Sequence, residues 1–300
     1  ISSILVKDED TKPEVVAFSS IETSGIKTGS IINIGLISED ISKSINELEN
    51  KSEEKIKDII VSFSGEQISS INSTGSVIIR QKEVTARDVQ SALNMSSTLK
   101  VPNDKTLLYV SPNEYTIDGQ PGIAEPIGMN GVRLEARTHL IYCSQNTKEN
   151  ISKCIEELND LRIKKFYFNQ LGAAESVLTQ DQRDLGVCLI DIGAGTTDLT
   201  VYKGGSIRFS KVFPYAGDYI TETIATSLKI TSTQAEEIKK KYGCAVLDSD
   251  SEDTLRIKGT NGNKEIEISR KALSEVIEQS LTRIIRHCAV CLEDNGMLSY

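Results

Sequence analysis

The sequence lacks the patterns that would place it in several common classes of protein. It has only two histidines and a single close pair of cysteines, Cys288 and Cys291, so a zinc site would lack ligands. Its apolar runs, such as residues 186–190, are far shorter than the roughly 20 residues that a membrane-spanning helix needs. Residues 1–7 have neither a basic start nor a cleavage site, so a signal peptide is not expected.

The chain also has fewer basic residues (34) than acidic residues (43). The formal net charge of -9 argues against a general nucleic-acid binder, because such proteins bind phosphates through basic clusters. The six cysteines lie mostly in apolar runs, and a chain this long does not need disulfide bonds to stabilise a core. We therefore expect a protein of the reducing cytosol. The first residue is isoleucine and not methionine, and we expect the chain to be a fragment.

Length and composition predict more than one hydrophobic core. With 300 residues, of which 38% are hydrophobic and 26% charged, the chain can bury real cores and keep a solvated surface. Two lobes, or one domain with a large insertion, are the expected organisation.

Apolar periodicity predicts an amino-terminal part and an insert. In the first part strands are expected at residues 1–6, 14–18 and 59–63, with a helix that Ser38 caps. From about Ile71 the character changes, and a strand, a helix begun by the capping pair Thr85 and Asp88, and two further strands follow. These two strands are expected at residues 107–117 and 132–143, separated by a Gly/Pro-rich loop.

The remaining half repeats the order of strands followed by helices. The expected elements are a helix at 151–158, strands at 164–168, 187–190, 199–202 and 207–212, a helix at 171–178, a helix capped by Asp218 and a long helix from about Ser269. Residues 179–184 are expected to be a polar break, the strand at 187–190 to be buried, and Gly204 with Gly205 to form a tight hairpin turn.

A glycine-rich turn between two of these strands is the most informative stretch. Residues 189–199 read Leu-Ile-Asp-Ile-Gly-Ala-Gly-Thr-Thr-Asp-Leu. Gly193 and Gly195 let the backbone reach positive φ and bring its N–H groups close to phosphate oxygens, and Thr196 and Thr197 add hydroxyl donors. Asp191 at the strand end can hold a hydrated magnesium ion. A hairpin whose glycines merely turn the chain is the alternative.

Two better-known phosphate-binding patterns do not fit this turn. It has no Gly-Lys-Ser/Thr sequence, so it is not a P-loop. The residues after it continue as a strand rather than a helix, which excludes a dinucleotide-binding turn.

The turn resembles the second phosphate loop of the superfamily of actin, sugar kinases and heat-shock chaperones. Within that superfamily the chain resembles the FtsA family of bacterial cell-division proteins over essentially its whole length. The stretches that carry this closer resemblance are residues 74–80, 83–85, 117–120, 128–136, 185–188 and 241–245.

The resemblance implies an α/β, actin-like (ribonuclease H-like) two-lobed fold with an inserted strand-helix-strand-strand subdomain. The implied parts are the first lobe at residues 1–70 and 146–185, the insert at 71–145, and a truncated second lobe at 186–300. The family's first phosphate loop and its glycine-rich adenosine loop are expected to lie outside the two ends of this sequence.

The resemblance also implies a site for ATP and magnesium. Asp191, Gly193, Ala194, Gly195, Thr196 and Thr197 take the phosphate and magnesium roles, and Gly217 begins a helix that faces the nucleotide. Glu236 and Lys239 share a helix face and are expected to hold the ribose and line the base, or else to form a solvent-exposed ion pair. Asn169 stands where relatives often carry the residue that orients the attacking water. Because asparagine cannot act as a base, we expect slow ATP hydrolysis or none.

The function implied is an ATP-binding scaffold that polymerises and tethers the FtsZ ring to the inner face of the cytoplasmic membrane at midcell. Its expected partners are the carboxyl-terminal tail of FtsZ, further copies of itself in a filament, and other division proteins bound through the insert. Membrane contact is expected through a carboxyl-terminal helix absent from this sequence. An ATP-dependent kinase or chaperone-type ATPase on the same fold, and a pilus-assembly relative of FtsA, are the rival functions.

Overall fold

The computed structural model describes residues 1–7, 13–98, 101–158, 161–246, 254–258 and 265–298. Contacts between residues divide the chain into two compact units. The first unit comprises Ile1–Leu189 and Thr200–Val212, and the second comprises Ile190–Leu199 and Phe213–Tyr300. The domain boundaries expected from the sequence remain predictions, because this division separates contact units and not subdomains.

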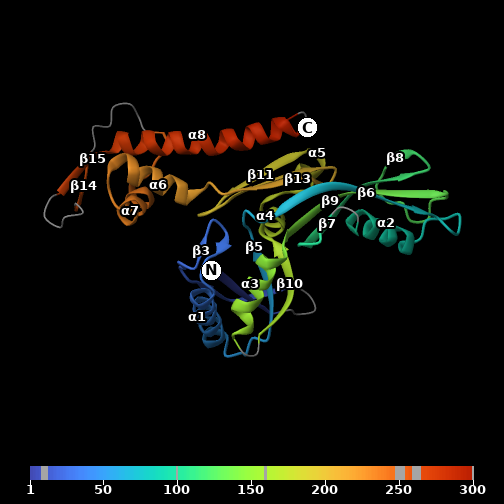
Figure 1. Cartoon of the computed structure of the whole chain (residues 1–300), viewed down its shortest axis with the longest axis horizontal. Helices are drawn as coiled ribbons and strands as arrows, with labels where there is room; N and C mark the ends of the chain where they lie inside the picture. The colour runs from blue at the N-terminus through green and yellow to red at the C-terminus, as the bar shows by residue number, and fades with distance from the viewer. Residues whose placement is uncertain (8–12, 99–100, 159–160, 247–253, 259–264, 299–300) are drawn as a thin grey trace. The chain divides into compact units, whose positions relative to one another are not determined.

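Outside the insert, the described part of the first unit contains three two-stranded sheets with helices beside them. Its elements outside the insert are β1 (Ser2–Lys7), β2 (Glu14–Ser20), β3 (Ile26–Lys27), β4 (Ser30–Ile31), α1 (Ile34–Ser52), β5 (Asp58–Phe63), α3 (Gln145–Glu156), β10 (Arg162–Phe168), α4 (Asn169–Val177) and α5 (Gln180–Leu185). Strands β1 and β2 pair antiparallel, while β5 and β10 pair parallel across a long stretch of intervening chain. Helices α1 and α3 contact each other beside these strands (Figure 1).

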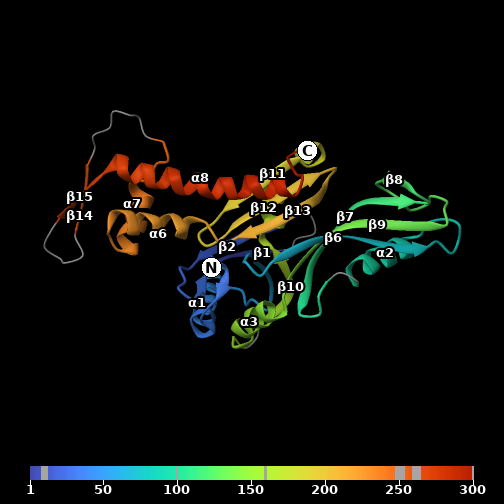
Figure 2. The ribbon, with the colours of Figure 1, turned by 45° about the horizontal axis from the view of Figure 1, so that its top comes forward.

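The insert is a four-stranded antiparallel sheet with one helix. It consists of β6 (Ser69–Ile78), α2 (Ala86–Thr98), β7 (Lys105–Ile117), β8 (Gln120–Ile123) and β9 (Arg133–Ser144), with strand order β6-β9-β7-β8. Helix α2 lies along one face of the sheet in both views (Figures 1 and 2). The strand-helix-strand-strand order expected from the sequence is confirmed, and the Gly/Pro-rich loop adds the short strand β8.

Helix α2 approaches β6 closely because small and hydroxylated residues line their contact. A Cβ atom added to Gly75 would lie 2.0 Å from the Ala92 carbonyl oxygen, a separation that no side chain tolerates. The Ser73 hydroxyl donates to the Ser96 carbonyl at 2.7 Å, and the Thr138 hydroxyl donates to Ser96 Oγ at 3.0 Å. Hydrogen bonds therefore satisfy the polar groups that this close packing buries.

A second polar contact joins the insert to strand β13 (Ser206–Phe213). The Ser70 hydroxyl donates to the Ser210 carbonyl at 2.7 Å, and the His139 ring nitrogens lie 2.7 Å from Asn72 Oδ1 and 2.9 Å from Ser210 Oγ. Burial of the imidazole lowers the pKa of His139 to about 4. His139 is therefore a neutral structural group at physiological pH.

Three strands, β11 (Val187–Ile192), β12 (Thr197–Lys203) and β13, form a sheet in the order of the chain. The turn between β12 and β13 has positive φ at both Gly204 and Gly205, as a two-residue hairpin of this kind requires. The predicted tight turn is confirmed. Strand β12 is buried along its length, whereas β11 alternates and ends exposed, so the expectation of a buried strand at 187–190 is wrong.

The second unit is built on three helices. Its elements beyond the end of β13 are α6 (Gly217–Leu228), α7 (Ser232–Tyr242), β14 (Thr254–Lys258), β15 (Glu265–Ser269) and α8 (Arg270–Asp294). The long helix α8 runs alongside α6 (Figure 2). Their core is aliphatic, with the buried side chains Ile220, Ile224, Ile238, Leu273, Ile277 and Ile284.

Three local expectations are corrected by the backbone. Helix α1 begins earlier than expected and Asn33 caps it, accepting from the Leu36 N–H at 3.1 Å, while Ser38 is buried inside the helix. Ala216 and not Asp218 occupies the N-cap position of α6. The expected break after Thr179 is helix α5, which a capping box between Thr179 and Gln182 begins.

Candidate functional site

The glycine-rich turn is a short loop between β11 and β12. The Gly193 N–H donates to the Thr196 carbonyl at 2.9 Å, which closes the turn. Residues 191–194 are exposed, Gly195 and Thr196 are half-buried, and Thr197 is fully buried. The part of the loop that contains Asp191 and Gly193 is therefore accessible to a ligand.

The expectation that Gly193 and Gly195 adopt positive φ is wrong. Among the described residues eight glycines have positive φ, and neither Gly193 nor Gly195 is one of them. A Cβ atom on Gly193 would lie 3.3 Å from the Thr196 carbonyl oxygen, which is tight. Ala194 is likewise outside the left-handed region, so its methyl group is tolerated there without backbone strain.

Thr197 anchors the loop from inside. Its hydroxyl donates to the Tyr215 carbonyl at 2.6 Å. The side chain of Tyr215 stacks on the ring of His287 from α8, with ring centroids 5.6 Å apart. The Thr197 hydroxyl is thus engaged with the protein, and the accessible hydroxyl of the pair belongs to Thr196.

The amino end of α6 is bonded directly to the loop. The Gly217 N–H donates to the Gly193 carbonyl at 3.0 Å, and the Asp218 N–H donates to the Ala194 carbonyl at 2.7 Å. These are the first two N–H groups of the helix, which have no acceptor within the helix itself. The loop carbonyls supply that acceptor, and the helix end and the loop form one hydrogen-bonded unit.

Helix α7 connects to the same helix end through a charged pair. Lys239 Nζ lies 2.5 Å from Glu236 Oε2 and donates to the Gly217 carbonyl at 3.1 Å and to Thr221 Oγ1 at 2.7 Å. The side chains of Lys239 and Glu236 are 20% and 33% exposed, so the pair is partly buried rather than solvent-exposed. It can still be reached by a ligand.

The Glu236 carboxyl group is held in its ionised form. Burial raises the pKa of Glu236, but hydrogen bonds from Lys239 and Thr221 together outweigh this and hold the pKa below its usual range. Lys240 adds a second ion pair at 3.3 Å. The carboxylate is therefore an acceptor at neutral pH, as a ligand hydroxyl would require.

Asp191 suits the magnesium ion expected from the sequence. Within the described residues its exposed carboxylate makes no ion pair or side-chain hydrogen bond. A magnesium ion typically keeps several waters and binds one or two carboxylates together with substrate phosphates, so a single free carboxylate fits it. The part of the chain that the structure describes contains no group of three or more His, Cys, Asp or Glu side chains that could hold a metal by itself.

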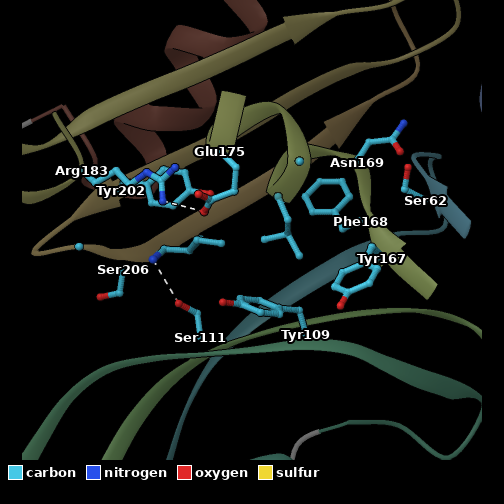
Figure 3. A pocket seen from close by; sticks show the side chains of 14 residues that line it. Ser62, Tyr109, Ser111, Tyr167, Phe168, Asn169, Glu175, Arg183, Tyr202 and Ser206 are labelled. Atoms are coloured by element: carbon cyan, nitrogen blue, oxygen red, sulfur yellow. Dashed lines mark hydrogen bonds and ion pairs between the residues drawn. The ribbon is translucent and has the colours of Figure 1, made fainter. Parts of the chain in front are cut away.

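Asn169 belongs to the first unit, where it lies at the rim of a pocket. The pocket has a volume of about 450 Å³ and is lined by residues of β7, β10, α4 and the β12–β13 hairpin, with Arg183 of α5. Asn169 is exposed and begins α4. Figure 3 shows Asn169 and Ser62 toward one side of the pocket and Arg183, Tyr202 and Glu175 toward the other.

Arg183 dominates the polar chemistry of this pocket. It forms an ion pair with Glu175 at 2.7 Å, which raises the pKa of the guanidinium, and its carbon Cζ lies 5.7 Å from the centre of the Tyr202 ring. Its Nε atom is buried and has no hydrogen-bond partner among the described residues. Burial also raises the pKa of Tyr202 to about 12.

Nine residues predicted from the sequence are joined by hydrogen bonds or by their place in one loop. Six belong to the loop, namely Asp191, Gly193, Ala194, Gly195, Thr196 and Thr197. The loop bonds to Gly217, and through Gly217 the network reaches Glu236 and Lys239. Asn169 is not part of this network, because it belongs to the first unit and the other nine residues belong to the second. Thr221 was missed, because a threonine inside a helix carries no signal in the sequence that distinguishes it from its neighbours.

Two family profiles match the chain. One, described as "SHS2 domain inserted in FTSA", matches residues 65–142, and the other, described as "Cell division protein FtsA", matches residues 188–295. The first covers nearly all of the insert, and the second begins just before the glycine-rich loop and ends in the turn after α8.

Curated proteins match over most of the chain. The cell division protein FtsA of Pseudomonas aeruginosa is 38% identical over 270 residues, which are 90% of this chain and 64% of that protein. The FtsA proteins of Escherichia coli K12 and of Neisseria meningitidis serogroup B are 34% and 35% identical and are covered to 66% and 67% of their lengths. The chain thus spans about two thirds of the length of these relatives.

A solved structure supports the fold. The chain in "PilM-PilN type IV pilus biogenesis complex" matches with a TM-score of 0.66 and 14% sequence identity, covering 99% of this chain and 74% of that one. At this identity the likeness concerns the fold alone.

No helix among the described residues is both long and apolar enough to cross a membrane.

Proposed function

Because this chain belongs to the FtsA family of cell-division proteins and has the actin-like fold with the family's insert, we propose that it is an ATP-binding scaffold of the division machinery. In this proposal it polymerises and tethers the FtsZ ring to the inner face of the cytoplasmic membrane at midcell. Binding of partners is its task, and ATP controls that binding.

The observation that carries the proposal is the hydrogen-bonded connection between the loop, α6 and α7. An exposed backbone turn with a free carboxylate at Asp191 offers a place for a magnesium-bound phosphate chain. The pair Glu236 and Lys239 offers an acceptor and a donor for a ribose, and both are tied to the loop through Gly217. In this proposal the loop binds the phosphate end of the nucleotide and the pair binds its ribose.

ATP acts in this proposal as a conformational ligand. It shifts the protein toward the state competent for polymerisation if it binds that state more tightly, and this requires no turnover. Asn169 has no basic group to activate water, and we propose that hydrolysis is slow. The insert is proposed to contact other division proteins and the next copy in a filament, and the FtsZ tail is the proposed ligand that brings the ring to the protein.

The first experiment tests ATP binding by calorimetric titration of magnesium-ATP into the full-length protein and into its Asp191→Ala variant. We expect the substitution to weaken binding at least tenfold, or about 1.4 kcal/mol, because it removes the carboxylate that holds the hydrated ion. Asp294→Ala is the matched control, since Asp294 is an exposed carboxylate at the end of α8 in the same unit. Equal affinities for all three proteins would refute the magnesium assignment.

The second experiment tests the partner. A labelled peptide with the sequence of the FtsZ carboxyl-terminal tail should bind the protein in a fluorescence anisotropy titration, and its scrambled version should not. A cytoplasmic peptide of a pilus-assembly protein serves as the competitor that a pilus-type relative would prefer. Selective binding of the pilus peptide would replace the division function with that of the rival.

A further inference from the structure

Thr221 lies at the centre of the polar contacts between α6 and α7. Its Oγ1 accepts a hydrogen bond from Lys239 Nζ at 2.7 Å and contacts both Glu236 Oε2 and, at 3.1 Å, the Gly217 carbonyl oxygen. The residue is 7% exposed. No other described hydroxyl group contacts both members of the Glu236 and Lys239 pair.

The direction of these bonds follows from counting hydrogens. A threonine hydroxyl has one hydrogen to donate, and the Lys239 ammonium can only donate to it. The Gly217 carbonyl already accepts from Lys239, whereas the Glu236 carboxylate is charged and is the closer and stronger acceptor. The hydroxyl therefore accepts from Lys239 and donates to Glu236. With the ion pair between Lys239 and Glu236, the three side chains form a closed network in which each contacts the other two.

Other threonines of the same helix do not share this arrangement. The Thr223 hydroxyl donates to the Tyr219 carbonyl at 2.7 Å and the Thr226 hydroxyl donates to the Glu222 carbonyl at 2.9 Å. Both are bonds to the backbone one turn earlier, which any helical threonine can make. Thr221 differs in reaching two charged side chains of another helix.

We propose that Thr221 is a positioning residue for the ribose of the nucleotide, acting through Glu236 and Lys239. By donating to one carboxylate oxygen and accepting from the ammonium, it fixes both side chains in the arrangement that meets a ribose hydroxyl pair. The inference rests on the proposed function, because it assigns a role within the proposed ATP site. It adds a residue that does not itself touch the ligand.

The alternative is that Thr221 merely stabilises the contact between two helices. A structural role would change the affinity for every nucleotide by the same factor. A positioning role acts only through Glu236 and Lys239, which are proposed to bind the ribose. Loss of the Thr221 hydroxyl should therefore reduce the discrimination between a nucleotide with its 2′-hydroxyl and one without it. This difference separates the two roles.

The experiment measures the affinities for magnesium-ATP and magnesium-2′-deoxy-ATP by calorimetry in four versions of the full-length protein. These are the unsubstituted protein, Thr221→Val, Thr221→Ser and the control Thr223→Val. Valine has the shape of threonine without the hydroxyl, and serine retains the hydroxyl. We expect the unsubstituted protein to prefer ATP about tenfold, the loss that one hydrogen bond to a charged group commonly brings.

In Thr221→Val this preference should fall to about twofold or less, while Thr221→Ser and Thr223→Val retain it within about twofold of the unsubstituted value. Equal weakening of both nucleotides in Thr221→Val, or a preference left intact, would overturn the inference and leave the proposed function standing. If the unsubstituted protein binds ATP without any preference over the deoxy form, the protein does not recognise the 2′-hydroxyl of the ribose and the inference fails. If it binds neither nucleotide, the proposed function fails and this inference with it.

Discussion

The helical core of the second unit and the sheet of the insert bury their residues in opposite ways. Helices α6, α7 and α8 meet through aliphatic side chains, with Ile224 and Leu273 fully buried. The insert also has apolar residues, but its closest contacts depend on Gly75, on hydroxyl groups around Ser96 and on the buried imidazole of His139. The helical core is stabilised by buried aliphatic area, whereas the insert adds close backbone packing and satisfied hydrogen bonds to an apolar cluster of its own.

The comparison explains what substitutions each region tolerates. An aliphatic core can exchange side chains of similar volume with small losses, because dispersion and burial are not directional. A contact that depends on the absence of a side chain and on hydrogen bonds tolerates few substitutions. An added atom clashes with the backbone, and a lost partner leaves a buried polar group without a hydrogen bond, so each lowers the free energy of unfolding. The two regions should therefore respond differently to changes of similar size.

The largest effect is expected for Leu273→Ala in α8. Deleting a fully buried aliphatic side chain removes its burial and leaves a cavity, with a loss of about 2–5 kcal/mol of unfolding free energy. Urea titration combined with hydrogen exchange of the α8 amides measures it. Leu298→Ala, at a 60% exposed leucine of the same unit, should change stability by less than about 0.5 kcal/mol. Similar effects at both positions would contradict the aliphatic core.

Gly75→Ala is expected to have the next largest effect, although it adds only one methyl group. The methyl carbon would meet backbone atoms of α2 that cannot rotate away, and we expect a loss of about 1–3 kcal/mol or more. Thermal unfolding followed by hydrogen exchange of the insert measures this loss.

Gly172→Ala provides the matched control. An added Cβ at Gly172 meets nothing within 4 Å, and the residue lies inside helix α4. Alanine there should stabilise the protein by about 0.5–1 kcal/mol through its better helix propensity. If Gly75→Ala were neutral, the close approach of α2 to β6 would be wrong.

The smallest expected effect depends on pH and concerns His139. Because burial lowers its pKa from 6.5 to about 4, folding favours the neutral ring. The resulting stability is complete above pH 6.5 and is lost as the pH falls from 6.5 toward 4, which amounts to roughly 1–2 kcal/mol between pH 7 and pH 5. The pH dependence of unfolding should be shallower by this amount in His139→Gln.

His287→Gln is the comparison for that experiment, because His287 is the other histidine of the chain and is exposed. A steeper profile in His139→Gln, or an unchanged one, would show that His139 is not the buried neutral group in the contact between insert and β13.

The contrast between the regions also marks how far the sequence could predict the fold. The stripe of α8 and the strands of the insert were predicted because an apolar side chain every third or fourth residue, or every second, leaves a repeating pattern. The hydroxyl cluster around Ser96 and the contact of His139 with Ser210 leave none, because they form between elements distant in the chain.

Capping and short helices were predicted less well. Ser38 and Asp218 have the chemistry of N-caps, but Asn33 and Ala216 occupy those positions. Competition between nearby polar residues for one cap is decided by where the helix packs, which local sequence does not contain. Helix α5 was missed because its capping box at Thr179 and Gln182 was interpreted as a polar break.

For the candidate site, the loop and its position between two strands were predictable from the glycines and flanking apolar runs. The sequence also suggested that Glu236 and Lys239 share a helix face, and the structure pairs them. It could not show that the Thr197 hydroxyl is turned inward to Tyr215, or that Thr221 joins the charged pair. Both depend on contacts between elements that are separate in the sequence.

The two bonds between the loop carbonyls and the start of α6 have a mechanical consequence. Breaking either bond would leave an N–H group at the start of the helix without an acceptor, so we expect the loop and the start of α6 to be displaced together. Helix α6 has 12 residues and is therefore about 18 Å long. A shift of the loop at Gly193 is therefore expected to reach Leu228, at the other end of α6, and with it the aliphatic contact to α8.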